Sequence, residues 1–335
     1  MLPVSIGSLP HQDPAEACAA IWACFPHLPS WPQLPKRSFL ENMYVQFSEG
    51  FPGLVLEEDR IYVDRRQDLS ADLERLYRAY LGKDLDGYAI GDSYAAGLAE
   101  WSGADFQRCR AVKGQVIGPV SWGLTVVDQD LRPVLYDEIL VDAVAKHLRL
   151  KAMWQERELR RLHPTTIILL DEPYMSSFGS AYVALSREQA IALIEEVLGG
   201  LRGLKGVHCC GNTDWSLVLS TSTDMLSFDA YEYAESVSLY AGEVRDFLRR
   251  GGIIVWGIVP RESGALAHET VQTLADRLLE GMGLLVNKGI PLDDLLAASL
   301  VSPCCGLGSS SLEETERALQ LTAGVSEEMR RRYLR

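Results

Sequence analysis

The chain has 335 residues, of which 47% are hydrophobic and 23% charged, a balance typical of a globular protein with a sizeable core. Its 46 acidic residues exceed its 32 basic ones, and a formal net charge of −14 repels phosphate backbones, so nucleic acid is not expected as a partner. No apolar run approaches the roughly 20 residues that span a bilayer. The N-terminus lacks the basic and apolar regions of a secretory signal, and we therefore expect a cytoplasmic protein with no membrane partner.

Short β-branched runs alternate with longer helical patterns along the whole sequence. The runs are almost continuously apolar, as in parallel strands that are covered on both faces. They predict strands at residues 4–7, 115–120, 165–173, 206–210, 225–230, 253–260 and 295–303. Helices are predicted at residues 132–162, 186–201, 236–250, 268–289 and 311–325. Ser186 with Gln189 resembles a capping box, which supports the start of one of these helices.

This alternation predicts an α/β fold, a single (β/α)8 TIM barrel formed by one domain over residues 1–335. No linker-like change of composition divides the chain. Residues 26–66, rich in proline and aromatic residues, are expected to cover one end of the barrel. Chemistry in such barrels gathers where the strands end. The unusual residues at the predicted strand ends are Ser8, Gly118, Asp171, Glu172, His208, Cys210, Asp229, Cys304 and Cys305.

Four of the seven cysteines form two pairs of neighbouring residues. One pair lies in V-H-C-C-G-N at residues 207–212 and the other in S-P-C-C-G-L-G at residues 302–308. Side chains alternate along a strand, so His208 and Cys210 point one way and Cys209 the other. One nitrogen and one sulfur at that spacing can share a zinc ion, with a second thiolate from the later pair.

Several alternatives remain open on spacing alone. The second thiolate can come from Cys304 or Cys305, and an oxygen ligand from Asp229 or Glu232. Buried cysteines also often fill a core without any metal. We expect that role for the other cysteines, which are Cys18, Cys24, Cys109 and Cys209.

These residues resemble motifs of the methionine synthase and uroporphyrinogen decarboxylase superfamily, most closely the C-terminal catalytic barrel of cobalamin-independent methionine synthase. That family carries H-x-C, an acidic residue on the next strand and a late P-x-C-G-L. Aligning P-x-C-G-L with residues 303–307 places the family's cysteine at Cys305, so the resemblance selects Cys305 over Cys304. Three further motifs match in order, so that the resemblance spans nearly the whole chain. They are I-G-S at residues 6–8, G-P-V-S at residues 118–121 and D-E-P at residues 171–173.

The resemblance implies a zinc-dependent methyltransferase of the methionine synthase type. Its zinc ligands would be His208, Cys210, Cys305 and Asp229. Ser8 and Asp171 would bind an amino acid thiol, with homocysteine as the expected substrate and methionine as the product. The zinc would activate the thiol as a thiolate, and no catalytic residue beyond the metal site is expected. Four further residues are expected around the pocket, namely Gly118, Trp122, Glu262 and His11.

Two departures from the family pattern concern the metal and the methyl donor. Asp229 is one methylene shorter than the family's usual glutamate ligand. The late motif that carries a catalytic histidine reads G-I-V-P-R-E-S at residues 257–263, with Glu262 in the histidine's place. That change, and the absence of a duplicated N-terminal barrel, favour a methyl-corrinoid over methyl-folate as donor, either free or on a corrinoid protein partner.

Three other functions remain as alternatives. The first is a corrinoid-linked methyltransferase for another thiol, such as coenzyme M. The second is a metal-free lyase like uroporphyrinogen decarboxylase, although S-L-P-H-Q-D-P at residues 8–14 lacks the basic residues expected there. The third is an accessory protein that binds zinc or a corrinoid without catalysis.

Overall fold

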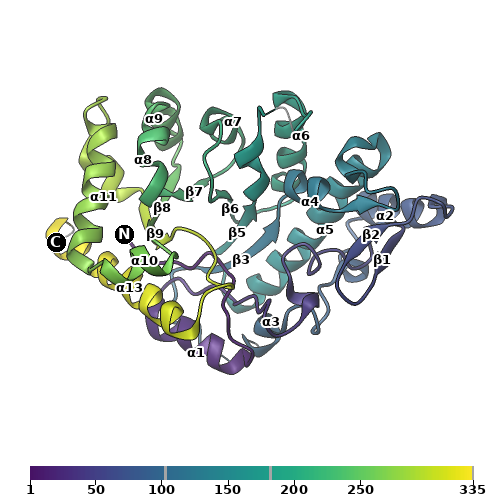
Figure 1. Ribbon diagram of the computed structural model, residues 1–335, viewed down its shortest axis with the longest axis horizontal. Helices are drawn as coiled ribbons and strands as arrows, with labels where there is room; N and C mark the ends of the chain where they lie inside the picture. Colours follow the sequence, from purple (N-terminus) through teal and green to yellow (C-terminus); the bar gives the residue numbers. More distant parts are fainter. Residues whose placement is uncertain (102–103, 181–182, 334–335) are drawn as a thin grey trace.

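The computed structural model describes residues 1–101, 104–180 and 183–333. Its main sheet has six parallel strands in the order β3-β5-β6-β7-β8-β9, and the sheet curls on itself (Figure 1). The strands are β3 (Val112–Ile117), β5 (Thr166–Asp171), β6 (Leu204–Cys209), β7 (Met225–Asp229), β8 (Ile253–Val259) and β9 (Ser299–Pro303).

Two extended segments from the N-terminal part of the chain fill the gap between β9 and β3. Residues 2–9 pair with β9, with 2.9 Å between Val4 N and Val301 O. Residues 29–33 pair with residues 2–9 on one side and with β3 on the other, through backbone hydrogen bonds of 2.9 to 3.3 Å. The ring therefore has eight members, of which six are regular strands and two make isolated parallel bridges. The predicted strand at residues 4–7 is one of these two bridged segments.

Helices cover the outside of the ring (Figure 1). They are α1 (Pro14–Cys24), α4 (Pro119–Thr125), α5 (Glu138–Leu162), α6 (Arg187–Leu198), α7 (Trp215–Ser220), α8 (Ala230–Ser238), α9 (Ala241–Arg249), α11 (Val271–Val286), α12 (Leu292–Ala297) and α13 (Leu312–Tyr333). The capping box predicted at Ser186 and Gln189 is confirmed at the start of α6. The last helix returns to the N-terminus, where Ser326 Oγ lies 3.3 Å from Met1 O.

Smaller elements lie beside the barrel. A three-stranded sheet joins β1 (Leu54–Leu56), β2 (Ile61–Val63) and β4 (Val127–Asp128). The remaining helices are α2 (Ser70–Gly82), α3 (Ala96–Glu100) and α10 (Ser263–His268). Short 3-10 turns are η1 (Phe39–Glu41), η2 (Asp86–Tyr88), η4 (Val134–Tyr136) and η5 (Pro173–Ser177). Part of the region expected only as a cover, residues 29–33, belongs to the barrel wall instead.

Several predicted elements have different boundaries in the structure; the helices expected at residues 132–162 and 311–325, for instance, are Glu138–Leu162 and Leu312–Tyr333. The strand expected at residues 115–120 ends at Ile117, because Gly118 and Pro119 begin helix α4, where a proline suits the first turn. The strand expected at residues 295–303 begins at Ser299, because its first apolar residues belong to α12. The helix expected at residues 236–250 is divided between α8 and α9.

The inner face of the barrel changes from apolar to polar along the strands. A separate apolar cluster contains Val4, Leu28, Ala111, Ile167, Leu169, Met225 and Val255. Asp171 follows Leu169 by two residues and Ser227 follows Met225 by two, so these polar side chains share the faces of the apolar ones. The apolar cluster thus forms a floor, and the polar side chains lie above it toward the carboxyl ends of the strands.

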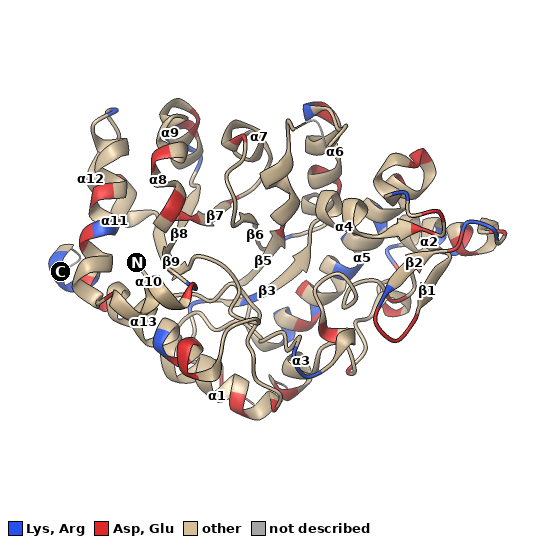
Figure 2. Cartoon of the chain, in the orientation of Figure 1, with Lys and Arg blue, Asp and Glu red and all other residues tan. Residues whose placement is uncertain are grey.

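The outer surface carries acidic and basic side chains interspersed over the helices, without one continuous basic face in this view (Figure 2). Among the residues that the structure describes, no helix combines the length and the hydropathy needed to cross a bilayer.

Candidate metal centre and substrate cavity

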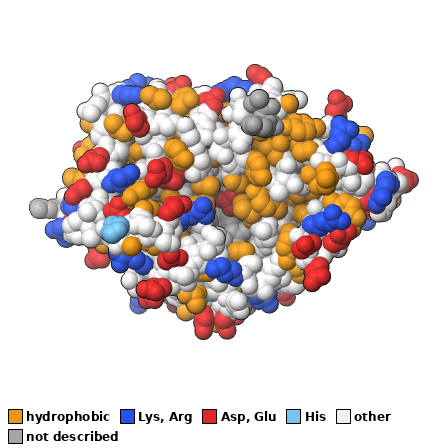
Figure 3. Space-filling model, in the orientation of Figure 1, with side chains coloured by type: hydrophobic (Ala, Val, Ile, Leu, Met, Phe, Trp, Pro, Cys, Tyr) orange, Lys and Arg blue, Asp and Glu red, His pale blue; other side chains and the backbone are white. Residues whose placement is uncertain are grey.

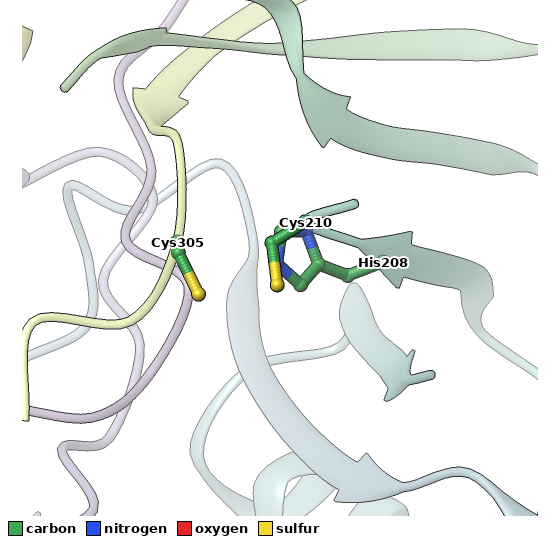
Figure 4. A group of neighbouring side chains, drawn as sticks. All are labelled: His208, Cys210 and Cys305. Atoms are coloured by element: carbon green, nitrogen blue, oxygen red, sulfur yellow. The ribbon is translucent and has the colours of Figure 1, made fainter. Parts of the chain in front are cut away.

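His208, Cys210 and Cys305 form a compact group at the carboxyl ends of the strands. Their ligand atoms all lie within 4.8 Å of one another (Figure 4). His208 lies in β6 and Cys210 directly after it, whereas Cys305 comes from the loop after β9. β6 and β9 are not neighbours in the sheet, so the curl of the barrel brings the two cysteines together.

His208 is held by one ring nitrogen and leaves the other without a partner. Its side chain is buried, and Nδ1 lies 2.9 Å from Oγ of Ser227, the residue beside it in β7. Nε2 is buried and has no hydrogen-bond partner among the described residues. With Nδ1 donating to Ser227, Nε2 keeps its lone pair, which is the arrangement typical of a metal-binding histidine.

The Cys210 and Cys305 sulfurs lie within 4.8 Å of each other. Interaction with Cys305 lowers the pKa of the Cys210 thiol, and His208 and the Arg261 guanidinium lower it further against the opposing effect of burial. Interaction with Cys210 raises the pKa of Cys305, and burial raises it further. One thiolate therefore forms readily in this pair, and a soft cation would favour loss of the second proton.

The other cysteine of each pair lies apart from this group. Cys209 points to the opposite side of β6, where its Sγ lies 3.4 Å from Gly211 O. Burial raises the pKa of both Cys209 and Cys304 to about 12, so both stay protonated thiols. Of the three remaining cysteines, Cys18 and Cys109 are buried and Cys24 is half-buried.

Neither acidic residue expected as a fourth ligand belongs to the group. Asp229 is buried at the end of β7, and its Oδ1 accepts a hydrogen bond of 3.0 Å from Glu232 N. Asp229 is thereby the N-cap of helix α8. Burial raises its pKa to about 6, and the charge of Cys210 contributes to the rise. The geometry thus brings three candidate ligands together, and Oδ1 of Asp229 caps a helix.

A cavity of about 230 Å³ opens onto the three-residue group. Ser8 and Asp171, the two residues expected to bind substrate, line this cavity together with His208, Cys210 and Cys305. The space-filling view shows a hollow near the middle of the molecule, with apolar side chains gathered on the side of α4 (Figure 3). The candidate metal-ligand group and the expected substrate residues therefore line one cavity.

Asp171 and Ser8 differ in how they are held. Burial raises the pKa of Asp171 to about 6, although nearby His208 and Lys113 oppose the shift, and its Oδ1 has no hydrogen-bond partner among the described residues. Ser8 Oγ accepts a hydrogen bond of 3.2 Å from Gly308 N. A Cβ at Gly306 would lie 2.2 Å from Ser8 Oγ, so only glycine permits this approach. The loop that carries Cys305 thus packs directly against Ser8.

The solved structures that share this fold include two B12-independent methionine synthase structures. The B12-independent methionine synthase of Shewanella sp. W3-18-1, in complex with selenomethionine, is 17% identical to this chain with a TM-score of 0.62, and the match covers 100% of this chain and 99% of the other. This chain has a methionine synthase fold. The putative vitamin B12-independent methionine synthase of Listeria monocytogenes is 13% identical, with a TM-score of 0.55 and coverage of 94% and 85%. No family model matches the sequence, and a search of curated proteins found no match.

On this methionine synthase fold, the four residues expected around the pocket do not line the cavity. Trp122 is buried and donates a hydrogen bond of 2.9 Å to Tyr44 O. Glu262 is exposed and pairs with Arg261 at 3.3 Å. His11 lines a separate groove with residues of α1 and α13. Gly118 packs against the buried side chain of Glu172.

Three charged residues near the cavity were not assigned a role from the sequence. Glu172 follows Asp171 but faces away from it, and its carboxylate accepts hydrogen bonds from the backbone N–H groups of Val120 and Ser121 at 3.0 and 2.8 Å. Arg261 lines the cavity beside Cys305. Lys113 is wholly buried in β3. The sequence could have indicated Lys113, because this lysine interrupts an apolar run two residues before Gln115. The predicted strand began only at Gln115 and therefore left Lys113 out.

Proposed function

We propose that this protein is a zinc-dependent thiol methyltransferase that converts homocysteine to methionine. The observation that carries the proposal is one cavity that joins the group of His208, Cys210 and Cys305 to Asp171 and Ser8. The methionine synthase fold supports it, and the Shewanella protein of that fold was solved with selenomethionine.

The residues fit zinc by their chemistry. One imidazole nitrogen and two sulfurs are ligands that zinc prefers, and His208 Nε2 is a buried atom in need of a partner. Zinc held there would supply a positive charge that favours the thiolate form of a substrate thiol at neutral pH. Ser227 fixes the His208 ring, and Cys210 and Cys305 would hold the zinc as thiolates. Asp229 is our candidate for a fourth ligand, because it lies at the end of β7, the strand next to β6.

The rest of the cavity suits a small amino acid. The carboxylate of Asp171 can accept hydrogen bonds from an ammonium group, and the Ser8 hydroxyl can donate to a carboxylate. The volume of about 230 Å³ lies below the roughly 300–1,000 Å³ of pockets for drug-sized ligands. This size suits a homocysteine-like substrate.

For the methyl donor we propose a methyl-corrinoid, free or bound to a partner protein. Of the six histidines, His208 alone lines the cavity, and its Nδ1 is engaged by Ser227. Glu262 replaces the family's catalytic histidine and is exposed. A corrinoid leaves as a cobalt(I) species that needs no proton on its leaving atom, whereas a folate nitrogen does. The free cysteines suit a reducing compartment, so we also propose a cytoplasmic location.

Demethylation of methylcobalamin by the zinc-loaded protein tests this proposal. We expect the methyl-cobalt absorbance to fall only when homocysteine is present. Loss of an outer residue that orients a metal ligand lowers metal affinity or activity by about 10- to 100-fold. Cys210→Ala removes a proposed ligand itself, so its demethylation rate should fall by at least that factor. Cys209→Ala is the matched control, because Cys209 faces away from the group, and it should keep the activity.

X-ray absorption of the bound zinc separates the enzyme from an accessory protein. Added homocysteine should bring one more sulfur to the zinc. An unchanged ligand set would contradict catalysis at this centre. A change with coenzyme M but not with homocysteine would contradict an amino acid substrate.

A further inference from the structure

The surface around α4 differs from the rest of the molecule in its charge. Although 23% of the whole chain is charged, three segments contain no Asp, Glu, Lys or Arg, namely residues 42–48, 118–127 and 173–186. Hydrogen bonds join these segments at α4. Trp122 Nε1 donates to Tyr44 O at 2.9 Å, and Tyr174 N donates to Ser121 Oγ at 3.0 Å. The three segments therefore meet in one uncharged region.

Large apolar and aromatic side chains reach the surface in this region. Tyr174 is 40% exposed. Met43, Tyr44, Leu124 and Phe178 pack on the core and are only partly buried. We call these five residues the α4 rim. Figure 3 shows apolar side chains gathered on this side of the hollow.

The α4 rim continues the wall of the substrate cavity. Met43 and Pro173 line the cavity, and Tyr44 and Tyr174 follow them directly in the chain. The rim is therefore the apolar side of the opening, beyond the part of the cavity proposed for the amino acid.

The candidate metal centre lies near the surface rather than deep in the barrel. Cys210 and Cys305 are both half-buried. A methyl donor that is too large to enter can therefore rest on the residues around the opening and point its methyl group toward a thiol at this centre.

The α4 rim matches the chemistry of a corrin ring. This ring is a broad, largely apolar macrocycle whose edge carries methyl groups and uncharged amide side chains. Aromatic and thioether side chains give apolar contact to such a face. The hydroxyl groups of Tyr44 and Tyr174 can exchange hydrogen bonds with the amides. An uncharged surface with polar tips suits this donor.

A folate donor with a glutamate tail would bring negative charges instead. The α4 rim has no Lys or Arg to pair with them, and the net charge of −14 opposes their approach. Arg261, which lines the cavity, follows β8 and pairs with Glu262 at 3.3 Å. In the ring of eight members, β8 lies across from β3, which precedes α4. This cation is therefore not part of the α4 rim.

We propose that the α4 rim is the surface on which the corrin ring of a free methyl-corrinoid rests during methyl transfer. A bond forms between the substrate sulfur and the methyl carbon while the cobalt–carbon bond breaks. The electron pair of that bond stays on cobalt, which leaves as cobalt(I), and the thiol proton goes to solvent. The inference rests on the proposed function, because it specifies how the proposed donor binds.

Equilibrium binding of two corrinoids to the zinc-loaded protein, without homocysteine, tests this surface. Methylcobalamin has a nucleotide tail with a phosphodiester, whereas methylcobinamide keeps the ring and its amides but lacks that tail. Because the rim is uncharged, we expect the two dissociation constants to agree within about threefold. In Tyr174→Ala both constants should rise by about 5- to 30-fold, the usual effect of removing an aromatic residue that anchors an interface.

Leu239→Ala is the matched control. Leu239 is also an exposed apolar residue, with 71% exposure, but it caps the C-terminus of α8 on the outside of the barrel. This variant should keep both dissociation constants. The zinc ligand set with homocysteine, measured by X-ray absorption, should be the same in Tyr174→Ala and the native protein. If Tyr174→Ala does not fold, Tyr174→Gln replaces it, because glutamine removes the ring and keeps a polar side chain.

The outcomes separate this inference from the proposed function. A native protein that binds homocysteine at its zinc but neither corrinoid would overturn the inference and leave the activation of the thiol intact. If homocysteine does not bind either, both proposals fail. Unchanged constants in Tyr174→Ala would show that the ring rests elsewhere. Binding of methylcobalamin without methylcobinamide would show that the nucleotide tail is recognised instead of the ring, and would also overturn the inference.

Discussion

At the scale of single residues, the two nitrogens of His208 have opposite surroundings. Nδ1 is bonded to Ser227 and Nε2 is unpartnered among the described residues, so the hydroxyl of Ser227 fixes the ring orientation. Such outer partners strongly affect metal affinity because a freely rotating imidazole must first be ordered. Ser227 does not line the cavity, so its replacement tests the candidate metal site without removing a cavity residue.

We predict that Ser227→Ala binds zinc about 10- to 100-fold more weakly than the native protein, measured by competition with a chelating dye. Ser5→Ala is the control, because Ser5 is a buried serine bonded to Ser30 Oγ at 2.9 Å and touches none of the proposed ligands. Equal zinc affinities of the Ser227→Ala and native proteins would show that Ser227 does not orient a ligand.

At the scale of elements, the junction of β3 and α4 depends on a glycine. Glu172 places its carboxylate at the N-terminus of α4, where it accepts N–H groups that have no partner within the helix. A Cβ at Gly118 would lie 2.1 Å from Glu172 Oε1. Gly118 is therefore required for close packing between α4 and the strand that carries Asp171, although it does not line the cavity.

We predict that Gly118→Ala lowers the free energy of unfolding by about 1–3 kcal/mol, because the Glu172 side chain must move. Urea denaturation followed by circular dichroism measures this change. Gly242→Ala is the matched control, since Gly242 lies in α9 with nothing within 4 Å of an added Cβ. There alanine should instead raise the stability, by up to about 1 kcal/mol. A Gly118→Ala variant as stable as Gly242→Ala would contradict the packing described above.

At the scale of the whole molecule, the proposed metal centre connects parts of the barrel that are distant in sequence. Cys210 follows β6, whereas Cys305 follows the last strand and its loop packs on Ser8 near the N-terminus. Zinc would therefore link the middle, the end and indirectly the beginning of the chain. The native state presents this site and the unfolded chain does not, so binding is coupled to folding.

We predict that zinc at about 1,000 times its dissociation constant stabilises the protein by about 4 kcal/mol, and that a chelator removes this gain. Thermal unfolding with and without the chelator measures it. The stabilisation by zinc should vanish in Cys305→Ala. It should persist in Cys18→Ala, because Cys18 lies in the core near α3. An unchanged increment in Cys305→Ala would exclude Cys305 as a ligand.

Several elements of this architecture followed from the sequence because they depend on local physics. The apolar runs and helical periods located most strands and helices, and the two-residue period of a strand placed His208 and Cys210 on one side and Cys209 on the other. The errors arose where a local pattern was ambiguous, as at residues 295–297, where an apolar run belongs to a helix rather than to the strand that follows it.

The sequence by itself thus determined the strand–helix alternation and one half of the metal-ligand group, since both reflect spacing between near neighbours. Only the tertiary structure decided that residues 2–9 and 29–33 close the ring, that Asp229 caps α8, and that Lys113 is buried inside the barrel. These outcomes depend on distances between residues far apart in the chain. Such distances are set by the curl of the whole sheet, which no local pattern contains.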